Sequence, residues 1–307
     1  MKVLVVGDVI IDKFHYGTAL GISAETPTIV AKRQEETFTL GGAANVCRHL
    51  EELCTTYAYL LTAADGNENI QAGLYTEVVE IPGYSVTTKE RFFVDGYKLL
   101  QFDQLNEGKH DNDSELQFCD AFDALLPDID RVVIADNRHG VMSRRIAAHL
   151  IKKCNQVGKP IIVDSQVSQS TTNHGWYRDC SIMLVNEREL DAIQFATSDC
   201  AYKFCEGNNE HFDKVLLNLS KKWNCDIVVK LGEKGSYSLI DGMFHRHHGH
   251  EVEIVDTCGA GDAFLAVLAS GELSSEDVSD NLRRANLWAA LSCEMKGTET
   301  PNGETLS

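Results

Sequence analysis

The chain alternates short apolar runs with amphipathic helical patterns, and this alternation constrains its fold more than any other feature. The apolar runs have the length of strands and cover residues 2–7, 56–62, 131–135, 160–164, 181–185 and 226–231. Apolar residues at helical spacing lie between several of them, at 41–54, 142–155, 187–195 and 209–223. Because strands that alternate with helices form βαβ units, we expect an α/β fold with a doubly wound, mostly parallel sheet and helices on both faces.

Two segments break this alternation and predict antiparallel strands outside the main sheet. Residues 13–40 show little helical period and contain several glycines and β-branched residues. Residues 84–105 predict a hairpin, because RFFV and YKLL flank Asp95-Gly96, a dipeptide favoured in two-residue type I′ turns. We expect these discontinuous segments to form a small β-sheet lid, followed by a polar loop over 104–115.

The chain is acidic and carries no signal for secretion or membrane insertion. Its 28 Lys and Arg against 46 Asp and Glu give a net charge of −18, which argues against nucleic-acid and anionic-membrane partners. Ten cysteines are scattered without a CxxC pair, mostly in apolar segments, as reduced core cysteines are. The first apolar run is broken by Asp8, and no run approaches the roughly 18 apolar residues of a membrane span. We therefore expect a soluble, cytoplasmic protein.

The stretch DTCGAGDAFLAVLASG, residues 256–271, joins a glycine turn, one carboxylate and an apolar helix. Apolar residues on every side predict a buried helix from Ala260, and Asp262 lies in its first turn behind Gly259 and Gly261. Free N–H groups at a helix start bind anions, and glycines let the backbone approach them closely. Asp262 could take a proton from a hydroxyl that attacks phosphorus, or it could simply favour the helix dipole.

Other nucleotide and metal motifs fit less well. No GxxxxGK[ST] occurs, and Phe264 stands where a dinucleotide fingerprint requires a small residue, which disfavours a nicotinamide enzyme. The histidines of HRHHGH, residues 245–250, would divide between the two faces of a strand, without a Cys or carboxylate at ligand spacing. We expect this stretch to be a solvated segment that leads into a strand before the glycine turn.

Four motifs, in their order and spacing, resemble those of the ribokinase-like (PfkB) carbohydrate kinases. They are GGAANV (41–46), NERE (186–189), KLGEKG (230–235) and DTCGAGDAF (256–264), and the last matches the family signature DTxGAGD. The resemblance extends from Val5 to about Gly297. It implies a ribokinase-like fold, a single kinase domain over residues 1–307, and transfer of the ATP γ-phosphate to a sugar hydroxyl with Mg²⁺.

The resemblance also implies a role for individual positions. Asp262 would be the general base, and the backbone N–H groups of Gly259, Ala260 and Gly261 would form the anion hole. The sugar would be held by Asp12, Gly41, Gly42, Asn45 and Asp136. The nucleotide would be held by Asn186, Glu189, Lys230, Gly232, Gly235 and Asn286, with Glu189 ordering Mg²⁺ through water. Without the resemblance, the Gly-Gly pair and the asparagine fit turn and capping chemistry, and NxxE fits an ordinary helix start.

Within the family the sequence most resembles the heptose-7-phosphate kinases, which phosphorylate the anomeric hydroxyl of D-glycero-D-manno-heptose 7-phosphate. GDVIIDKFHYG, ISAETP (22–27) and LGGAANV are similar to that subfamily's GDxxLDxYxxG, ISPEAP and GGAANV. TTKER (87–91) is similar to its lid segment TxKxR, so Lys89 and Arg91 are expected to face a substrate phosphate. The alternative is that these two cations only discourage pairing at the lid edge.

The chain departs from the subfamily at two places that bear on the sugar. ADNRHG (135–140) stands where the subfamily has SDYGKG, and VDSQ (163–166) where it has VDPK, so both lysines are missing. Arg138 or His139 could replace one charge. A kinase for fructose, ribose or a nucleoside therefore remains an alternative, as does a non-catalytic sugar or nucleotide sensor. We expect no fused nucleotidyltransferase domain, and the apolar hairpin faces predict a homodimer through the lid.

Overall fold

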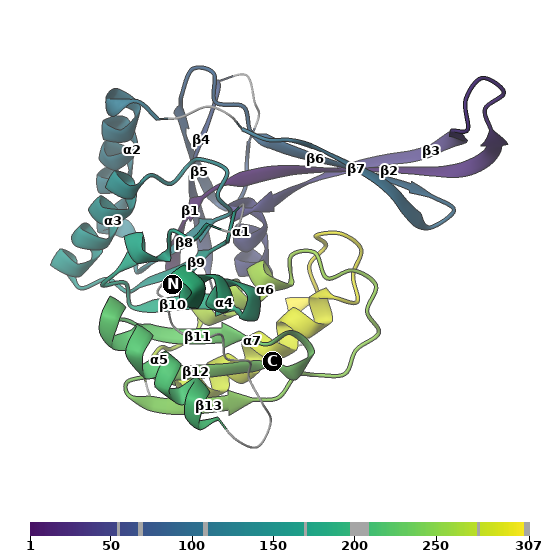
Figure 1. The fold of residues 1–307 in the computed structure, drawn as a ribbon. Helices are drawn as coiled ribbons and strands as arrows, with labels where there is room; N and C mark the ends of the chain where they lie inside the picture. Colours follow the sequence, from purple (N-terminus) through teal and green to yellow (C-terminus); the bar gives the residue numbers. More distant parts are fainter. Residues whose placement is uncertain are drawn as a thin grey trace.

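The computed structural model describes residues 1–53, 56–66, 70–106, 110–168, 171–196, 209–274 and 277–303. Three of the ten cysteines, Cys54, Cys200 and Cys205, lie outside these residues, as does the end of the helix expected over 41–54. The described chain forms a layered α/β body from which a second, smaller sheet projects (Figure 1). None of the described helices is long and apolar enough to cross a bilayer.

The main sheet of the described chain has nine strands in the order β13-β12-β11-β10-β9-β8-β1-β4-β5. Neighbours from β11 to β5 are parallel, and the edge pairs β11–β12 and β12–β13 are antiparallel. The strands are β1 (Lys2–Gly7), β4 (Tyr57–Ala64), β5 (Tyr75–Glu80), β8 (Arg131–Asp136), β9 (Ile161–Ser165), β10 (Ile182–Asn186), β11 (Asp226–Lys230), β12 (Ser236–Ile240) and β13 (Met243–His247). The mostly parallel sheet predicted from the alternation is confirmed.

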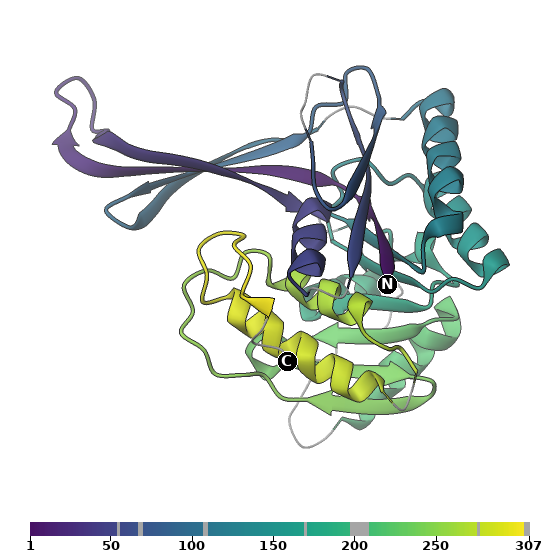
Figure 2. The same cartoon turned by 180° about the vertical axis from the view of Figure 1, so that it is seen from behind.

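Helices cover both faces of this sheet, as Figures 1 and 2 show from opposite sides. One face packs against α2 (Asn112–Leu125), α3 (Arg144–Val157), α4 (Glu187–Ala196) and α5 (Glu210–Trp223). The other face packs against α1 (Ala43–Glu52), α6 (Ala260–Ser270) and α7 (Val278–Ser292). In β1, Leu4 and Val6 join the first core and Val3 and Val5 the second, because successive side chains of a strand point to opposite faces.

The structure differs from the sequence-based expectation on both sides of the body. Part of the expected loop 104–115 is helical, because Asp111 caps α2: its Oδ1 accepts from the N–H of Ser114 at 2.8 Å, and its own N–H donates to Ser114 Oγ at 2.9 Å. The strand expected before the glycine turn is absent from the described chain. Residues 248–259 instead form a loop that connects β13 to α6.

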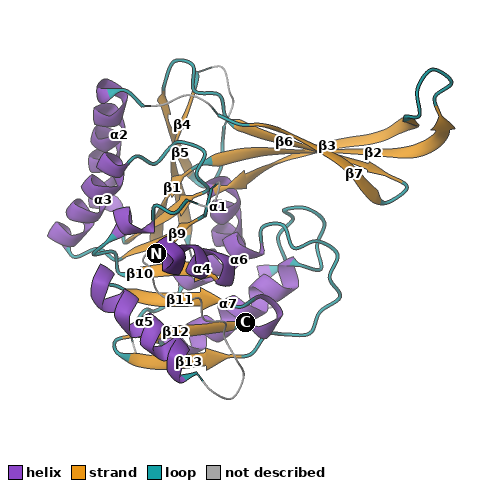
Figure 3. Ribbon diagram, in the orientation of Figure 1, coloured by secondary structure: helices purple, strands orange, loops and turns teal. Residues whose placement is uncertain are grey.

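The second sheet, called the lid sheet below, projects from the body as long strands (Figure 3). Its strand order in the described chain is β3-β2-β6-β7. Its strands are β2 (Val9–Ile22), β3 (Ile29–Gly42), β6 (Thr87–Val94) and β7 (Tyr97–Gln104). The turn between β6 and β7 has positive φ at Asp95 (49°) and Gly96 (81°), which confirms the predicted type I′ geometry. β2 and β6 pair in parallel with Asp12 opposite Lys89, so the lid sheet brings its two segments together near the body.

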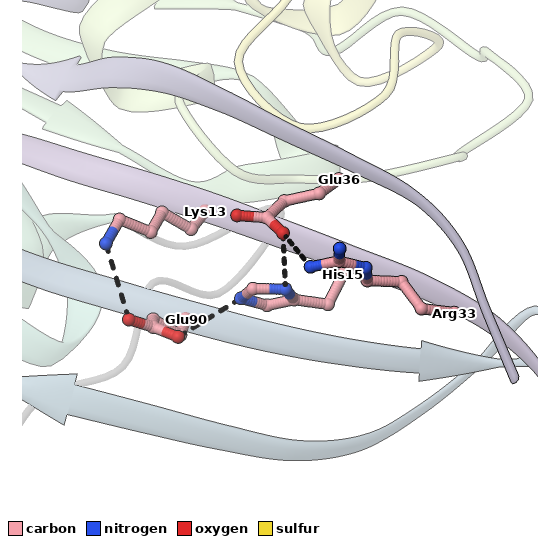
Figure 4. Close-up of polar contacts among 5 residues, drawn as sticks. All are labelled: Lys13, His15, Arg33, Glu36 and Glu90. Carbon is pink, nitrogen blue, oxygen red and sulfur yellow. Dashed lines mark hydrogen bonds and ion pairs between the residues drawn. The ribbon is translucent and has the colours of Figure 1, made fainter. Parts of the chain in front are cut away.

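A chain of polar contacts between ionisable side chains joins three strands of the lid sheet (Figure 4). His15 on β2 lies 3.1 Å from Glu90 on β6 and 3.7 Å from Glu36 on β3. Lys13 and Arg33 extend the chain by ion pairs with Glu90 at 3.5 Å and Glu36 at 2.8 Å. Exposed pairs of this kind contribute at most about 1 kcal/mol each. Cross-strand packing, such as His15 stacked on Phe92 at 4.4 Å, stabilises the same register.

Candidate active site

The glycine turn places Asp262 in the first turn of α6. Gly259 is the N-cap residue and has φ of 82°, a left-handed conformation that a side chain would disfavour. The seven residues from Ala263 to Ala269 are buried, so the helix is anchored in the core as predicted. No side-chain hydrogen bond caps this helix start in the part of the chain that the structure describes. The N–H of Ala260 makes a long bond to the backbone oxygen of Thr257 at 3.4 Å, whereas the amides of Gly261 and Asp262 have no acceptor among the described residues and are available to an anion.

Asn45, buried in the first turn of α1, orients the carboxylate of Asp262. Its Nδ2 donates to Asp262 Oδ2 at 2.9 Å, although the two residues are 217 positions apart. Arg48 donates to Asn45 Oδ1 at 2.9 Å, which determines that the amide nitrogen faces the acid. The two helix starts are thus joined at their N-terminal turns, where both dipoles favour negative charge.

The surroundings of Asp262 make it a base near neutral pH. Burial raises the pKa of its carboxyl to about 7, and the charges of Asp164 and Asp12 act in the same direction. The hydrogen bond from Asn45 and the charge of Lys230 lower the pKa in part. A general base is most effective when its pKa lies near the working pH.

A pocket of about 200 Å³ lies between the lid sheet and the start of α6, and we call it the acceptor pocket. Its lining includes many of the predicted site residues: Asp12, Gly41, Gly42, Lys89, Arg91, Asn186, Glu189, Lys230, Gly259, Gly261 and Asp262. Arg91 donates to Asp12 at 2.6 Å and lies over the ring of Phe14. Gly41 leaves room for this acid, because a Cβ there would lie 2.3 Å from Asp12 Oδ2.

A second, larger cavity of about 870 Å³ adjoins the acceptor pocket, and we call it the nucleotide groove. The two share Asn186, Lys230 and Gly261, so they meet beside the glycine turn. Predicted nucleotide residues in this groove are Asn186, Lys230, Gly232, Gly235 and Asn286, with Ala260 of the turn. Its apolar lining of Val252, Ile254, Phe264, Ala289 and Ala290 and its size are typical of a site for a flat organic ligand.

Charged side chains gather where β9, β10 and β11 end, in the part of the acceptor pocket that adjoins the nucleotide groove. Lys230 donates to Asp164, an acid that the motif analysis missed although it is the last residue of the strand predicted over 160–164. Burial opposes the charged form of Lys230, but the charges of Asp164 and Glu189 outweigh it and raise the lysine pKa. Ligand sites in parallel sheets form at these carboxyl ends, which is the signal that could have identified Asp164.

Asn186 and Glu189 bind each other across the start of α4. The N–H of Asn186 donates to Glu189 Oε2 at 2.7 Å, and the N–H of Glu189 donates to Asn186 Oδ1 at 2.9 Å. Burial and the charge of Asp164 raise the pKa of Glu189 to about 7. Such repulsion between two acids is relieved by a cation, and Mg²⁺ uses one or two carboxylates beside phosphates and waters. The described residues hold no cluster of three metal-ligating side chains.

Two predicted sugar residues do not line the acceptor pocket. Asn45 lies directly behind it and acts on Asp262. Asp136 is buried, and its Oδ2 accepts from Ser165 at 2.9 Å, from Asn173 at 2.7 Å and from Tyr177 at 2.6 Å. Asn137, which follows Asp136 in the chain, lines the acceptor pocket instead. Lining residues that sequence reasoning did not single out are Asn137, Asp164, Gln166, Cys258 and Thr298.

Asp262, with a pKa raised to about 7, lies at the open start of a helix, next to a polar pocket and a larger groove. This arrangement suits phosphoryl transfer to a hydroxyl. The sequence profile of the pfkB family carbohydrate kinases matches residues 1–305. The chain therefore belongs to this family of carbohydrate kinases, whose members are ATP-dependent phosphotransferases.

Curated relatives span nearly the whole chain. The bifunctional protein HldE of Paramagnetospirillum magneticum is 27% identical over 99% of the chain, and that of Rhodopseudomonas palustris 28% over 97%. The chain spans 62% and 61% of these two relatives.

Solved structures share the fold. Arabidopsis thaliana ribokinase, in complex with ribose and ATP, matches with a TM-score of 0.71 at 18% identity over 99% of this chain and 96% of its own. Escherichia coli phosphofructokinase-2, in complex with potassium, matches with 0.73 at 15% identity over 99% and 96%. The predicted ribokinase-like fold with its lid sheet is confirmed.

Proposed function

We propose that this kinase transfers the γ-phosphate of ATP to O1 of D-glycero-β-D-manno-heptose 7-phosphate and forms the 1,7-bisphosphate. One observation carries the proposal: Asp262, with a pKa raised to about 7, lies where the acceptor pocket and the nucleotide groove meet. Residues 1–307 would act as one kinase domain, with the lid formed by segments 13–40 and 84–105.

The proposed reaction needs a base, an electrophile and charge stabilisation at one point. Asp262 takes the proton of the attacking sugar hydroxyl, whose oxygen forms a bond to the γ-phosphorus as the bond to ADP breaks. The amides of Gly259, Ala260 and Gly261 stabilise the charge that develops on the transferred group. With a pKa raised to about 7, Asp262 would be partly ionised at neutral pH and ready to accept the proton.

The choice of heptose 7-phosphate rests on the resemblance of segments 22–27 and 87–91 to the heptose-7-phosphate kinases. The similarity to HldE proteins supports it. Lys89 lines the acceptor pocket as a cation that could meet the substrate phosphate, and Asp12 could accept from sugar hydroxyls. Because the chain spans about six tenths of those relatives, we propose only the kinase reaction for it.

Mg²⁺ fits the two acids that line the acceptor pocket beside Lys230. Glu189, through water, and Asp164 would hold the ion, which would neutralise phosphate charge when bound. Lys230 would contact the phosphates beside these acids, while Gly232, Gly235 and Asn286 would border the nucleotide.

The lid sheet would close over the sugar and exclude water from the reaction. It also exposes large apolar side chains: Leu20, Ile22, Phe38, Tyr97 and Phe102 are between 61% and 78% exposed. A homodimer that pairs two lid sheets would cover them. The cytoplasm is the proposed location, because it supplies ATP and keeps thiols such as those of the described free cysteines reduced.

A panel of free and phosphorylated sugars, with heptose 7-phosphate first, tests the function by ADP release and by NMR of the product. The expected result is a 1,7-bisphosphate and a kcat/KM for heptose 7-phosphate at least tenfold above those of ribose, fructose and nucleosides. Asp262→Asn is the control: it should keep ATP binding and lose two or more orders of magnitude in turnover. A faster free sugar would overturn the substrate, and sugar binding without turnover by the wild type would indicate a sensor.

A further inference from the structure

Two neutral amide side chains form one wall of the acceptor pocket. Asn137 follows β8 and Gln166 follows β9, and both line the pocket. Gln166 Nε2 donates to Asn137 Oδ1 at 2.6 Å, so the two side chains act as one unit. Asn137 also lies against the turn that carries Gly42, since a Cβ at this glycine would be 2.8 Å from Asn137 Nδ2.

This amide pair keeps unused hydrogen-bonding groups at the pocket. The bond between the two side chains uses one N–H of Gln166 and the oxygen of Asn137. The oxygen and second N–H of Gln166 and the Nδ2 group of Asn137 have no partner among the described residues. A sugar hydroxyl both donates and accepts, so it can satisfy such a set of donors and an acceptor together.

Most of the cations that line the acceptor pocket are already in ion pairs, so few remain for a substrate phosphate. Arg91 is paired with Asp12, and Lys230 with Asp164. Lys89 is the lining cation without an ion pair to any residue that the structure describes. One cation is available for a phosphate, while the amide wall offers neutral hydrogen bonds.

Asp136 holds both halves of the amide pair in place from behind. Its Oδ1 accepts from the N–H of Arg138 at 2.9 Å, which fixes the turn just after Asn137, and its backbone oxygen accepts from the N–H of Gln166 at 3.0 Å. The side chains of Ser165, Asn173 and Tyr177 hold the same carboxylate. Asp136 therefore acts on the pocket through its neighbours and is a positioning residue.

We propose that the Asn137–Gln166 pair determines acceptor specificity by binding sugar hydroxyls away from the attacking oxygen, and that it does not bind the substrate phosphate. This inference rests on the proposed function of the same pocket. It predicts that the sugar is chosen by the pattern of its hydroxyls through neutral hydrogen bonds. It also predicts that the phosphate, where present, is bound elsewhere, at Lys89.

The test compares heptose 7-phosphate with free heptose, by calorimetric titration of the wild-type protein, Gln166→Leu and Lys89→Met. Gln166→Leu should raise the Kd of both sugars by the same factor, about tenfold for one or two lost hydrogen bonds. Lys89→Met should weaken only the phosphorylated sugar. Gln156→Leu, at an exposed position on α3, is the matched control and should change neither Kd.

Deoxy analogues of heptose 7-phosphate sharpen the test. An analogue that lacks the hydroxyl bound by the pair should bind wild type about tenfold more weakly and should lose nothing further in Gln166→Leu. Unchanged ATP affinity and an unchanged unfolding midpoint would show that the variant is folded.

Three results would overturn the inference. Gln166→Leu could weaken binding of the phosphorylated sugar alone, it could change the Kd of both sugars by less than twofold, or the wild-type protein could bind no sugar. If instead the variants behave as expected but wild type transfers no phosphate, the proposed function fails and the inference stands.

Discussion

Replacing Asn45 with alanine should move the acidic limb of the pH–activity profile to higher pH. The Nδ2 of Asn45 donates to the ionised form of Asp262 at 2.9 Å and thereby lowers its pKa. Removing this donor favours the protonated acid, which cannot act as a base. The direction is therefore fixed: less activity below and near neutrality, with recovery at high pH.

The size of the shift follows from the strength of one hydrogen bond to a charged group. Such bonds contribute about 1.5–3 kcal/mol, and one pKa unit corresponds to about 1.4 kcal/mol. Because Asp262 faces an open pocket, water would replace part of the bond, so we expect a shift of about one pH unit. Starting from a pKa of about 7, kcat/KM at pH 7 should fall about fivefold from this cause.

The assay is kcat/KM for the sugar from pH 5.5 to 9.5 at constant ionic strength, since this parameter reports groups of the free enzyme. Asn155→Ala is the matched control, because Asn155 donates one hydrogen bond, to the backbone oxygen of Asp179 at 2.9 Å, away from the site. If Asn45 also contacts the sugar, its loss lowers kcat/KM equally at every pH, which is separable from a shift. An acidic limb with an unchanged midpoint in Asn45→Ala would refute the assignment of Asp262 as the titrating base.

Three further changes test other parts of the site. Gly259→Ala should lower the free energy of unfolding by about 1–2 kcal/mol, because the residue has a positive φ. It should also lower kcat at least tenfold, because the new Cβ would lie 2.7 Å from Asn45 Nδ2. A variant that melts and turns over like the wild type would contradict this. Lys230→Met leaves Asp164 without its ion pair and should raise KM for ATP tenfold or more, whereas an effect on the sugar alone would place the nucleotide elsewhere. Phe38→Glu, at a lid residue 74% exposed, should convert the proposed dimer to monomer in sedimentation velocity; an unchanged mass would remove the lid sheet from the interface.

Contacts between residues close together in the sequence could be predicted, whereas contacts between residues far apart in the sequence could not. The turn at Asp95 and Gly96 depends on two adjacent residues, and the start of α6 on a short glycine-rich stretch, so both were recognisable in the sequence. The contact between Asn45 and Asp262 joins residues 217 positions apart. It exists because α1 and α6 pack on the same face of the sheet. No local pattern contains that information.

The sequence also could not show which of the two acids Asp164 and Asp136 would reach the acceptor pocket. Both acids lie at the carboxyl ends of neighbouring strands, and they pair in register with Ala135 and Ser165. Yet Asp164 lines the acceptor pocket, while Asp136 points into a buried cluster with Tyr177. Successive residues of a strand face opposite sides of the sheet, and the sequence does not say which side carries the site.

By itself, the sequence determined the α/β class, most of the elements, the lid hairpin and the glycine-rich motif at the start of α6, because these depend on periodicity and on residues close in the chain. The tertiary structure alone decided which acids, amides and cations meet at the pocket. Those contacts arise when distant strand and helix ends converge at one edge of the sheet, and folding brings them there through packing of the whole core.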